Sequence, residues 1–205
     1  MLQVSNDRLL SRAIKQGVSL ASCLAIVLVA RTSLADQYVV PTGSMLPPIE
    51  LDDRVVVDKR AYGIRNPIGE GYLVPLSDPK PGDVVILGAP DEPRTLIKRV
   101  VAGPGAVVSV RDGQIAIAGR KAPIVRDGFG EHEILAGKDH RIRRIPDGGP
   151  DFGPVAVPDG EFLVMGDNRG DSKDGRFFGF IKRDAIRGRA VGVWLRHGAI
   201  AWHPL

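Results

Sequence analysis

Residues 95–110 read TLIKRVVAGPGAVVSV, and this stretch decides the class of fold. Residues 95–102 are mostly apolar and β-branched, which is typical of a buried strand. The GPG at residues 103–105 predicts a turn, and residues 106–110 have the pattern of a second strand. We therefore expect two neighbouring strands joined by a tight turn, with Lys98 set inside the first.

The chain beyond residue 36 repeats this pattern of short apolar runs between turns. It holds 25 glycines and 16 prolines among 205 residues, a content that favours many short strands over long helices. Further strands are expected at residues 37–40, 54–58, 83–87, 114–118, 160–165 and 190–195. The predicted fold is all-β or mostly β. Residues 182–189 suggest one short helix, and residues 119–159 suggest an insertion or irregular loops.

Ser44 and Lys98 are candidates for a nucleophile and its base. Ser44 lies in a segment bounded by proline and glycine, residues 41–47 (PTGSMLP). A serine hydroxyl attacks well only when a base removes its proton, and a lysine can act as that base only when it is neutral. Burial in an apolar strand lowers a lysine pKa and so favours the neutral form. Without further motifs, such a pair is more often a turn-forming serine and a solvated strand lysine.

Five short motifs follow one another along the chain. They are residues 43–47 (GSMLP), 58–64 (DKRAYGI), 81–85 (PGDVV), 97–105 (IKRVVAGPG) and 166–179 (GDNRGDSKDGRFFG). In this order they resemble the motifs of the bacterial type I signal peptidases, or leader peptidases. Residues 43–47 resemble the nucleophile box of that family, and residues 97–105 the box that carries its general base. The similarity covers residues 37–182 and is weak between 111 and 158. Departures from the family pattern occur at Ala106, Gly170 and Lys173.

The resemblance implies a fold and a set of roles. The fold is the family's antiparallel coiled β-sheet domain, with one N-terminal transmembrane helix. The catalytic pair is Ser44 and Lys98, with the Ser44 N–H and the Thr42 hydroxyl as the oxyanion hole. Ser172 occupies the position whose hydroxyl orients the lysine, and Asp174 with Arg176 matches a supporting ion pair.

Two further expectations come from neighbouring positions. Since side chains alternate along a strand, Arg99 should point to the opposite face from Lys98 and stay solvated. Asp167 and Asn168 should hold the turn of the last motif.

The first 35 residues differ from the rest of the chain. Residues 1–16 form an expected cytoplasmic segment with three basic residues, residues 17–35 an expected transmembrane anchor, and residues 36–205 the exported peptidase domain. A cleaved signal peptide is the alternative, because Ser33, Leu34 and Ala35 form a small-x-small site after an apolar core. The anchor interpretation places the protein in the bacterial inner membrane, with a single pass and a periplasmic or otherwise extracytoplasmic catalytic domain.

Several other chemistries find no support in the sequence. The net charge of +4 is mild and scattered, and the one dense basic cluster (residues 141–144) is short, so no nucleic-acid partner is expected. The four histidines belong to no motif, which leaves a Ser-His-Asp triad unsupported. The acidic loop at residues 166–174 lacks the alternating ligand spacing of a calcium site. No metal and no cofactor are expected.

The function predicted is a membrane-bound serine endopeptidase that removes signal peptides from preproteins after small-x-small sites. Its partners would be preproteins or prepilins and the lipid bilayer. Alternatives are a conjugative-transfer peptidase that matures a pilin or transfer protein, and a catalytically silent assembly factor. A self-cleaving Ser-Lys repressor would need a DNA-binding N-terminus, which the apolar segment does not offer. Substrates are expected to bind as strands between residues 37–40 and 95–98.

Overall fold

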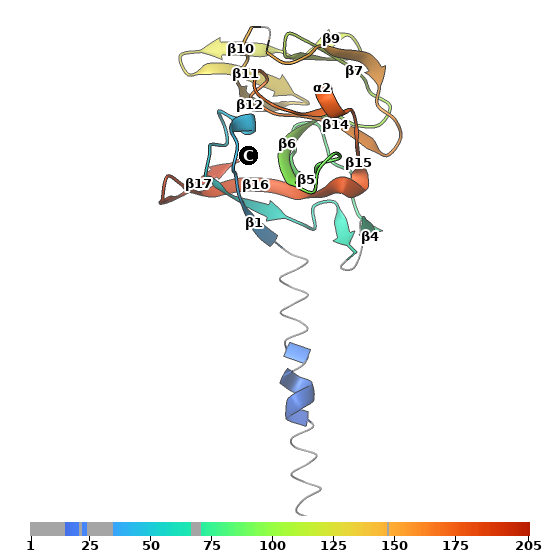
Figure 1. Ribbon diagram of the computed structural model, residues 1–205, viewed down its shortest axis with the longest axis vertical. Helices are drawn as coiled ribbons and strands as arrows, with labels where there is room; N and C mark the ends of the chain where they lie inside the picture. Colours follow the sequence, from blue (N-terminus) through green and yellow to red (C-terminus); the bar gives the residue numbers. More distant parts are fainter. Residues whose placement is uncertain (1–14, 21, 24–34, 67–70, 147) are drawn as a thin grey trace, which may run out of the picture.

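The computed structural model describes residues 15–20, 22–23, 35–66, 71–146 and 148–205. Residues 15–20 and 22–23 are helical, and the remainder is built mainly of β-strands (Figure 1). Among the described residues, no helix combines the length and the apolar character needed to cross a membrane. Most of the expected cytoplasmic segment and anchor, at residues 1–14, 21 and 24–34, lies outside the described ranges.

A curled, antiparallel, eight-stranded sheet forms the centre of the described fold (Figure 1), and it confirms the mostly β prediction. Six of its strands cover the runs expected from the sequence. In spatial order the strands are β1 (Ala35–Val39), β2 (Arg54–Asp58), β16 (Ile186–Arg196), β5 (Val84–Gly88), β6 (Thr95–Ala102), β14 (Glu161–Met165) and β15 (Ile181–Lys182), with β17 (Ala199–Pro204) paired to β16.

Alternation along residues 95–99 of β6 sends neighbouring side chains to opposite faces of the sheet. Ile97 and Arg99 lie opposite Ile86 and Val84 of β5, whereas Lys98 lies opposite Val85. Residues directly opposite in an antiparallel pair share a face. Ile97 belongs to a buried cluster with Met45 and Val55, and Val85 to another with Tyr62 and Phe162. Lys98 therefore lies on the same face of β6 as Leu96 and Val100, which pack in the second of these clusters.

Residues 119–159 are largely ordered strand, so the expectation of irregular loops is wrong there. β7 (Val107–Arg111), β8 (Gln114–Ile117), β9 (Arg120–Lys121) and β13 (Phe152–Ala156) form a four-stranded sheet. A three-stranded sheet consists of β10 (Ile124–Asp127), β11 (Gly130–Leu135) and β12 (Lys138–Ile142). β12 is hard to recognise from its sequence, because most of its residues are polar and only His140 and Ile142 are buried. These sheets cover the top of the molecule in Figure 1.

The short helix expected at residues 182–189 is also mostly wrong. Only a single 3-10 turn, η2 (Arg183–Ala185), occurs there, between β15 and the start of β16. β16 alternates buried and exposed residues from Ile186 onward, so packing against β2 and β5 overrides the weak helical pattern. A small hairpin of β3 (Gly63–Arg65) and β4 (Tyr72–Pro75) lies below β15, at the right of Figure 1.

One half of β6 has a free edge that positions the site. β5 pairs with residues 95–99, but β14 pairs only with Arg99, Val100 and Ala102. Among the described strands, none hydrogen-bonds to residues 95–98 on the side away from β5. The 3-10 turn η1 (Gly43–Met45) lies beside this edge. The sheet therefore leaves a slot between η1 and β6.

Candidate active site

Ser44 lies in η1, on a loop that enters the core after β1. Its neighbour Met45 is completely buried in the cluster that holds Ile97, and this anchors the turn. The backbone N–H of Asn168 donates to the Ser44 carbonyl at 3.1 Å, and Asn168 Nδ2 donates to the Gly43 carbonyl at 3.0 Å. Asn168 thus fixes the serine loop directly, a contact that a turn-forming role does not suggest.

Lys98 approaches Ser44 from the neighbouring strand. Its Nζ lies 2.6 Å from Ser44 Oγ, and the lysine is only 2% exposed. Burial lowers the pKa of Lys98 from its usual 10.5 to about 8, and the charge of Arg94 acts in the same direction. The carboxylates of Asp174 and Asp167 oppose this effect. The outcome is a lysine that can lose its proton near neutral to mildly alkaline pH.

Gly166 brings the last motif close to the serine loop. A Cβ at this position would collide with Ser172 Oγ and with the Ser44 carbonyl oxygen. The Gly166 N–H donates to Asp174 Oδ2 at 3.0 Å, which holds the backbone in place. Only glycine lets these two segments approach so closely, because every other residue places a carbon where the oxygens lie.

Asp174 and Arg176 form a fully buried pair beside this contact. Arg176 Nε and Nη2 each donate to the carboxylate at 2.9 Å, in a two-pronged arrangement. The same carboxylate accepts the Arg176 N–H and so caps α2 (Gly175–Phe178). The pair shapes the loop that carries Ser172 and Gly166.

Ser172 and Thr42 reach the same groove as Ser44 and Lys98. Ser172 is buried, and among the described residues its hydroxyl has no hydrogen-bond partner, so the structure shows no bond from Ser172 to Lys98. Thr42 is exposed, directly precedes η1 and makes no side-chain capping bond to it. The groove has a volume of about 320 Å³ and is lined by residues 41–44, 94–98 and 171–173.

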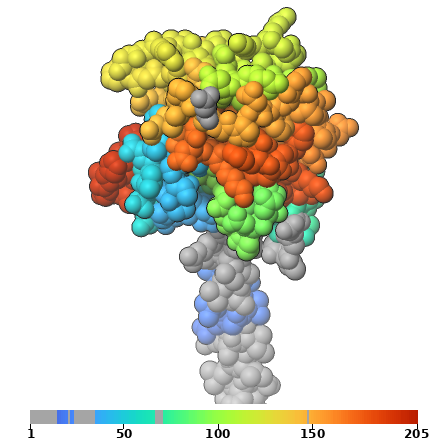
Figure 2. All heavy atoms as spheres, turned by 45° about the horizontal axis from the view of Figure 1, so that its top comes forward, coloured from blue at the N-terminus to red at the C-terminus, as the bar shows by residue number. Residues whose placement is uncertain are grey.

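Three segments far apart in the sequence build this groove. The blue, green and orange surfaces near residues 45, 90 and 172 lie together on the face seen in Figure 2. The structure thus brings Ser44, Lys98, Thr42 and Ser172 to one place, and the groove lies along the free edge of β6.

The expectation that Arg99 stays solvated is wrong. Arg99 does point to the opposite face from Lys98, but it is 3% exposed. Its Nε and Nη2 donate to the two oxygens of Asp167 at 2.8 and 2.7 Å, and Nη1 donates to the Gly82 carbonyl at 2.8 Å. A buried guanidinium is tolerated because a carboxylate and a carbonyl satisfy it. Alternation along a strand predicts on which face of the sheet a side chain lies, but not whether a buried partner packs against that face.

A second buried pair joins the site loop to the three-stranded sheet. Arg169 Nη2 lies 2.5 Å from Glu133 Oε2 on β11, and Arg169 Nη1 donates to the Gly113 carbonyl at 2.8 Å. Burial acts to raise the pKa of Glu133, but Arg169 and His140 outweigh it and leave that pKa at about 2. The sequence gives no signal for this pair, since its members lie in segments with no shared motif.

Comparisons with known proteins identify the family of the chain. The family described as "Signal peptidase, peptidase S26" matches residues 13–195. The signal peptidase I of Pseudomonas fluorescens is 33% identical over 211 residues, covering 89% of this chain and 72% of that protein. The signal peptidase I of Pseudomonas aeruginosa is 32% identical over 209 residues, with the same coverage. A solved signal peptidase I from Enterococcus faecalis aligns with a TM-score of 0.41 and 25% identity, over 56% of this chain and 97% of that one.

The groove thus places a serine hydroxyl in contact with a buried lysine amine within a β-rich fold. With the family match over most of its length, the chain belongs to the signal peptidase family, peptidase S26.

Proposed function

We propose that this protein is a membrane-bound serine endopeptidase that removes signal peptides from exported preproteins, with Ser44 as nucleophile and Lys98 as general base. One observation carries the proposal: the 2.6 Å contact between Ser44 Oγ and Nζ of a buried lysine whose pKa is about 8. A contact of this length permits direct proton transfer. Family membership supports the same reaction class.

The reaction begins when neutral Lys98 takes the proton from Ser44 Oγ as the oxygen attacks the scissile carbonyl carbon. The carbonyl oxygen then becomes an oxyanion. The Ser44 N–H lies in the first turn of η1, where backbone N–H groups lack an acceptor within the turn, and with the Thr42 hydroxyl it would stabilise that charge. The Lys98 ammonium returns its proton to the departing amine, leaving an ester on Ser44. Neutral Lys98 next activates a water molecule, which hydrolyses the ester.

Supporting roles follow from the contacts of the site loop. The Ser172 hydroxyl, free of other partners among the described residues, would orient Lys98 during the proton transfers. Asp174 and Arg176 would support the site by fixing Gly166 against the serine loop. Each hydrogen-bond donor to a developing oxyanion is worth about 3–4 kcal/mol in comparable enzymes.

The free edge of β6 is the proposed substrate slot. An extended peptide can add itself to residues 95–98 on one side and to the segment before Ser44 on the other. Small side chains next to the scissile bond fit a groove of about 320 Å³ shared by a whole peptide segment. We place residues 36–205 outside the bacterial inner membrane and residues 17–35 in it as a single-pass anchor, with residues 1–16 cytoplasmic.

The experiment measures cleavage of a panel of preproteins and prepilins by the full-length protein in detergent, and the N-termini of the products are mapped by sequencing. Ser44→Ala and Lys98→Ala should each abolish cleavage, and the double variant should lose little more, because the two side chains act as a unit. Lys98→Arg should also be inactive, since arginine cannot lose its proton at usable pH. Cleavage by Lys98→Ala at the wild-type rate would contradict the mechanism. Cleavage of prepilins alone, from a panel that includes general preproteins, would point to the conjugative-transfer alternative.

A further inference from the structure

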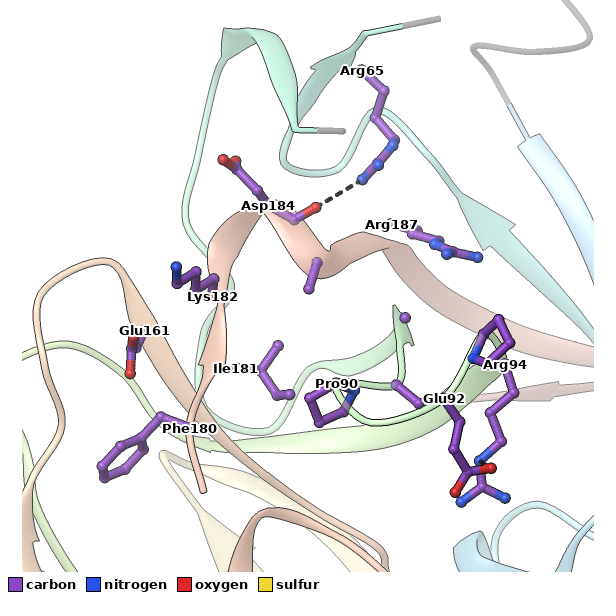
Figure 3. Close-up of a pocket in the computed structure, with 14 residues that line it drawn as sticks. Arg65, Pro90, Glu92, Arg94, Glu161, Phe180, Ile181, Lys182, Asp184 and Arg187 are labelled. Carbon is purple, nitrogen blue, oxygen red and sulfur yellow. Dashed lines mark hydrogen bonds and ion pairs between the residues drawn. The ribbon is translucent and has the colours of Figure 1, made fainter. Parts of the chain in front are cut away.

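A second, larger cavity meets the groove at the start of β6. It has a volume of about 580 Å³ and lies on the side of β5, β15 and η2 (Figure 3). Arg94 lines both this cavity and the groove that holds Ser44. Arg187, from the cavity, also donates from Nη1 to Oγ1 of Thr95, a groove residue, at 2.9 Å. Two separate residues thus join the cavity to one end of the groove.

The lining of the cavity is rich in charged side chains of both signs, with four cations and three carboxylates. Arg65, Arg94, Lys182 and Arg187 contribute four cations (Figure 3). The acidic residues on its lining are Glu92, Glu161 and Asp184. A short apolar floor with Ile181 completes it.

The cations differ in how strongly they are engaged. Arg65 donates to the carbonyl of Ile186 at 2.9 Å, and Arg94 pairs with Glu92 at 3.2 Å. Lys182 is exposed, and the structure records no ion pair for it among the described residues. Lys182 and Arg187, which is also exposed and has no ion pair among those residues, are therefore the cations best able to receive a new anionic partner. Lys182 is the simpler one to test, because Arg187 also bonds to Thr95, although Glu161 lies opposite Lys182 on β14.

Substrate chemistry decides which flank of the scissile bond suits this cavity. The flank that precedes the bond in a signal peptide is small and apolar, and burying it against these charged side chains would remove water from them without giving them partners. The flank that follows the bond belongs to the exported protein and is polar. An acidic side chain there would find positive partners at the end of the groove, and exposed pairs of this kind act mainly on selectivity and encounter.

We propose that this cavity binds the first residues of the substrate after the scissile bond, and that it favours acidic side chains there. The inference rests on the proposed function of Ser44 and Lys98 and adds a preference on the mature side of the substrate. It also gives the β5–β6 loop, residues 89–94, a role as the wall between groove and cavity. Lys173 ties this wall to the opposite rim through Glu92 at 3.6 Å and Asp91 at 3.8 Å.

Three peptides with identical residues before the scissile bond test the inference. One ends a single residue after the bond, one continues with three acidic residues, and one continues with three serines. The full-length wild-type protein should cleave the acidic peptide with a kcat/KM about three- to ten-fold above that of the serine peptide, the range that one or two exposed charge pairs supply. The advantage should fall as salt is raised.

Lys182→Glu should remove or reverse the acidic preference and leave cleavage of the shortest peptide unchanged. Lys121→Glu is the matched control, because Lys121 is an exposed lysine on β9, at the far end of the molecule (Figure 1). This control makes the same change in net charge, so it should keep the wild-type preference.

The outcomes separate the two proposals. Equal rates on the acidic and serine peptides, with the shortest peptide still cut, would overturn the cavity assignment alone. An equal effect of Lys182→Glu on all three peptides would overturn it too. If wild type cuts none of them, the proposed function fails and the inference fails with it. Lys182→Glu could instead weaken binding to phosphatidylglycerol vesicles more than Lys121→Glu does, with the peptide preference unchanged. The cavity would then be a lipid headgroup site and the inference would be wrong.

Discussion

Replacing Lys98 with methionine should abolish activity and make the protein more stable at neutral pH. The folded chain holds the pKa of Lys98 at about 8 rather than 10.5, because burial disfavours the ammonium. At about 1.4 kcal/mol for each tenfold change in the acidity constant, charged Lys98 lowers the free energy of unfolding by about 3 kcal/mol. Methionine is unbranched, apolar and of similar length, so it removes this cost without leaving a large cavity.

The loss of one hydrogen bond offsets part of that gain. The contact from Lys98 Nζ to Ser44 Oγ contributes about 1 kcal/mol, so the net stabilisation should be about 2 kcal/mol at pH 7. For a domain of this size, that corresponds to a rise in Tm of about 4–8 °C.

The pH dependence makes the reasoning specific. Below pH 8 the lysine is charged in both the folded and the unfolded chain, so the full cost is present in wild type. Between pH 8 and 10.5 the folded chain has released the proton and the unfolded chain has not, so wild-type stability rises with pH. The advantage of Lys98→Met should therefore fade over this interval and disappear at about pH 10, where the remaining cost of the charge no longer exceeds the contribution of the lost hydrogen bond, about 1 kcal/mol.

Urea unfolding of wild type and Lys98→Met in detergent, at about pH 6, 8 and 10, measures the difference in their free energies of unfolding. The control is Lys121→Met, an exposed site where the change should stay within about 0.5 kcal/mol at every pH. The reasoning is refuted if Lys98→Met is less stable than wild type at pH 7, or if its advantage is the same at pH 6 and 10.

Four further outcomes are expected. Wild-type kcat/KM should rise with pH up to a pKa near 8, because only neutral Lys98 accepts the serine proton, and a flat profile from pH 6 to 9 would contradict this assignment. Gly166→Ala should lower kcat by about tenfold or more and lower the free energy of unfolding by about 1–3 kcal/mol, because the added Cβ meets Ser172 and the Ser44 carbonyl. Gly128→Ala is the control, since open space surrounds Gly128, and it should change neither quantity in the same assays. Asn168→Ala removes the bond to the Gly43 carbonyl, so it should cost about 1 kcal/mol in urea unfolding and lower kcat more than it raises KM, and an unchanged kcat would argue against this positioning role. EDTA should leave the cleavage rate unchanged, because the proposed steps use only side chains, and a loss restored by added zinc would count against them.

The sequence predicts the central sheet well and singles out Ser44 and Lys98, which the structure places in contact, and both results have a physical reason. Strands buried on one or both faces carry apolar patterns that can be recognised locally, and the motif that contains Lys98 lies in such a strand. β10 to β12 escape recognition because their buried positions are filled by residues such as Glu133 and His140. A buried charge looks like a solvated one in the sequence, since its partner lies in a distant segment. The same limit explains the error on Arg99.

Asn168 shows where a motif is informative without being sufficient. Its motif marks the loop as important, but only the fold reveals that the side chain reaches the Gly43 carbonyl across 125 positions of sequence. The free hydroxyl of Ser172 is a similar case. Its position in the groove follows the motif, whereas its hydrogen-bonding state depends on small rotations that no pattern encodes.

The free edge at residues 95–98 bears on how much of a substrate sequence the proposed peptidase would read. Strand addition recognises the backbone, which every polypeptide carries, and side chains of an added strand point alternately into the groove and away from it. Every second position is then inspected and the one between is ignored. Such a slot contacts few side chains of the substrate, so one enzyme of this kind could cleave many exported proteins with unrelated sequences. Inhibitors that copy only the extended backbone should, by the same logic, be hard to escape through changes in groove side chains.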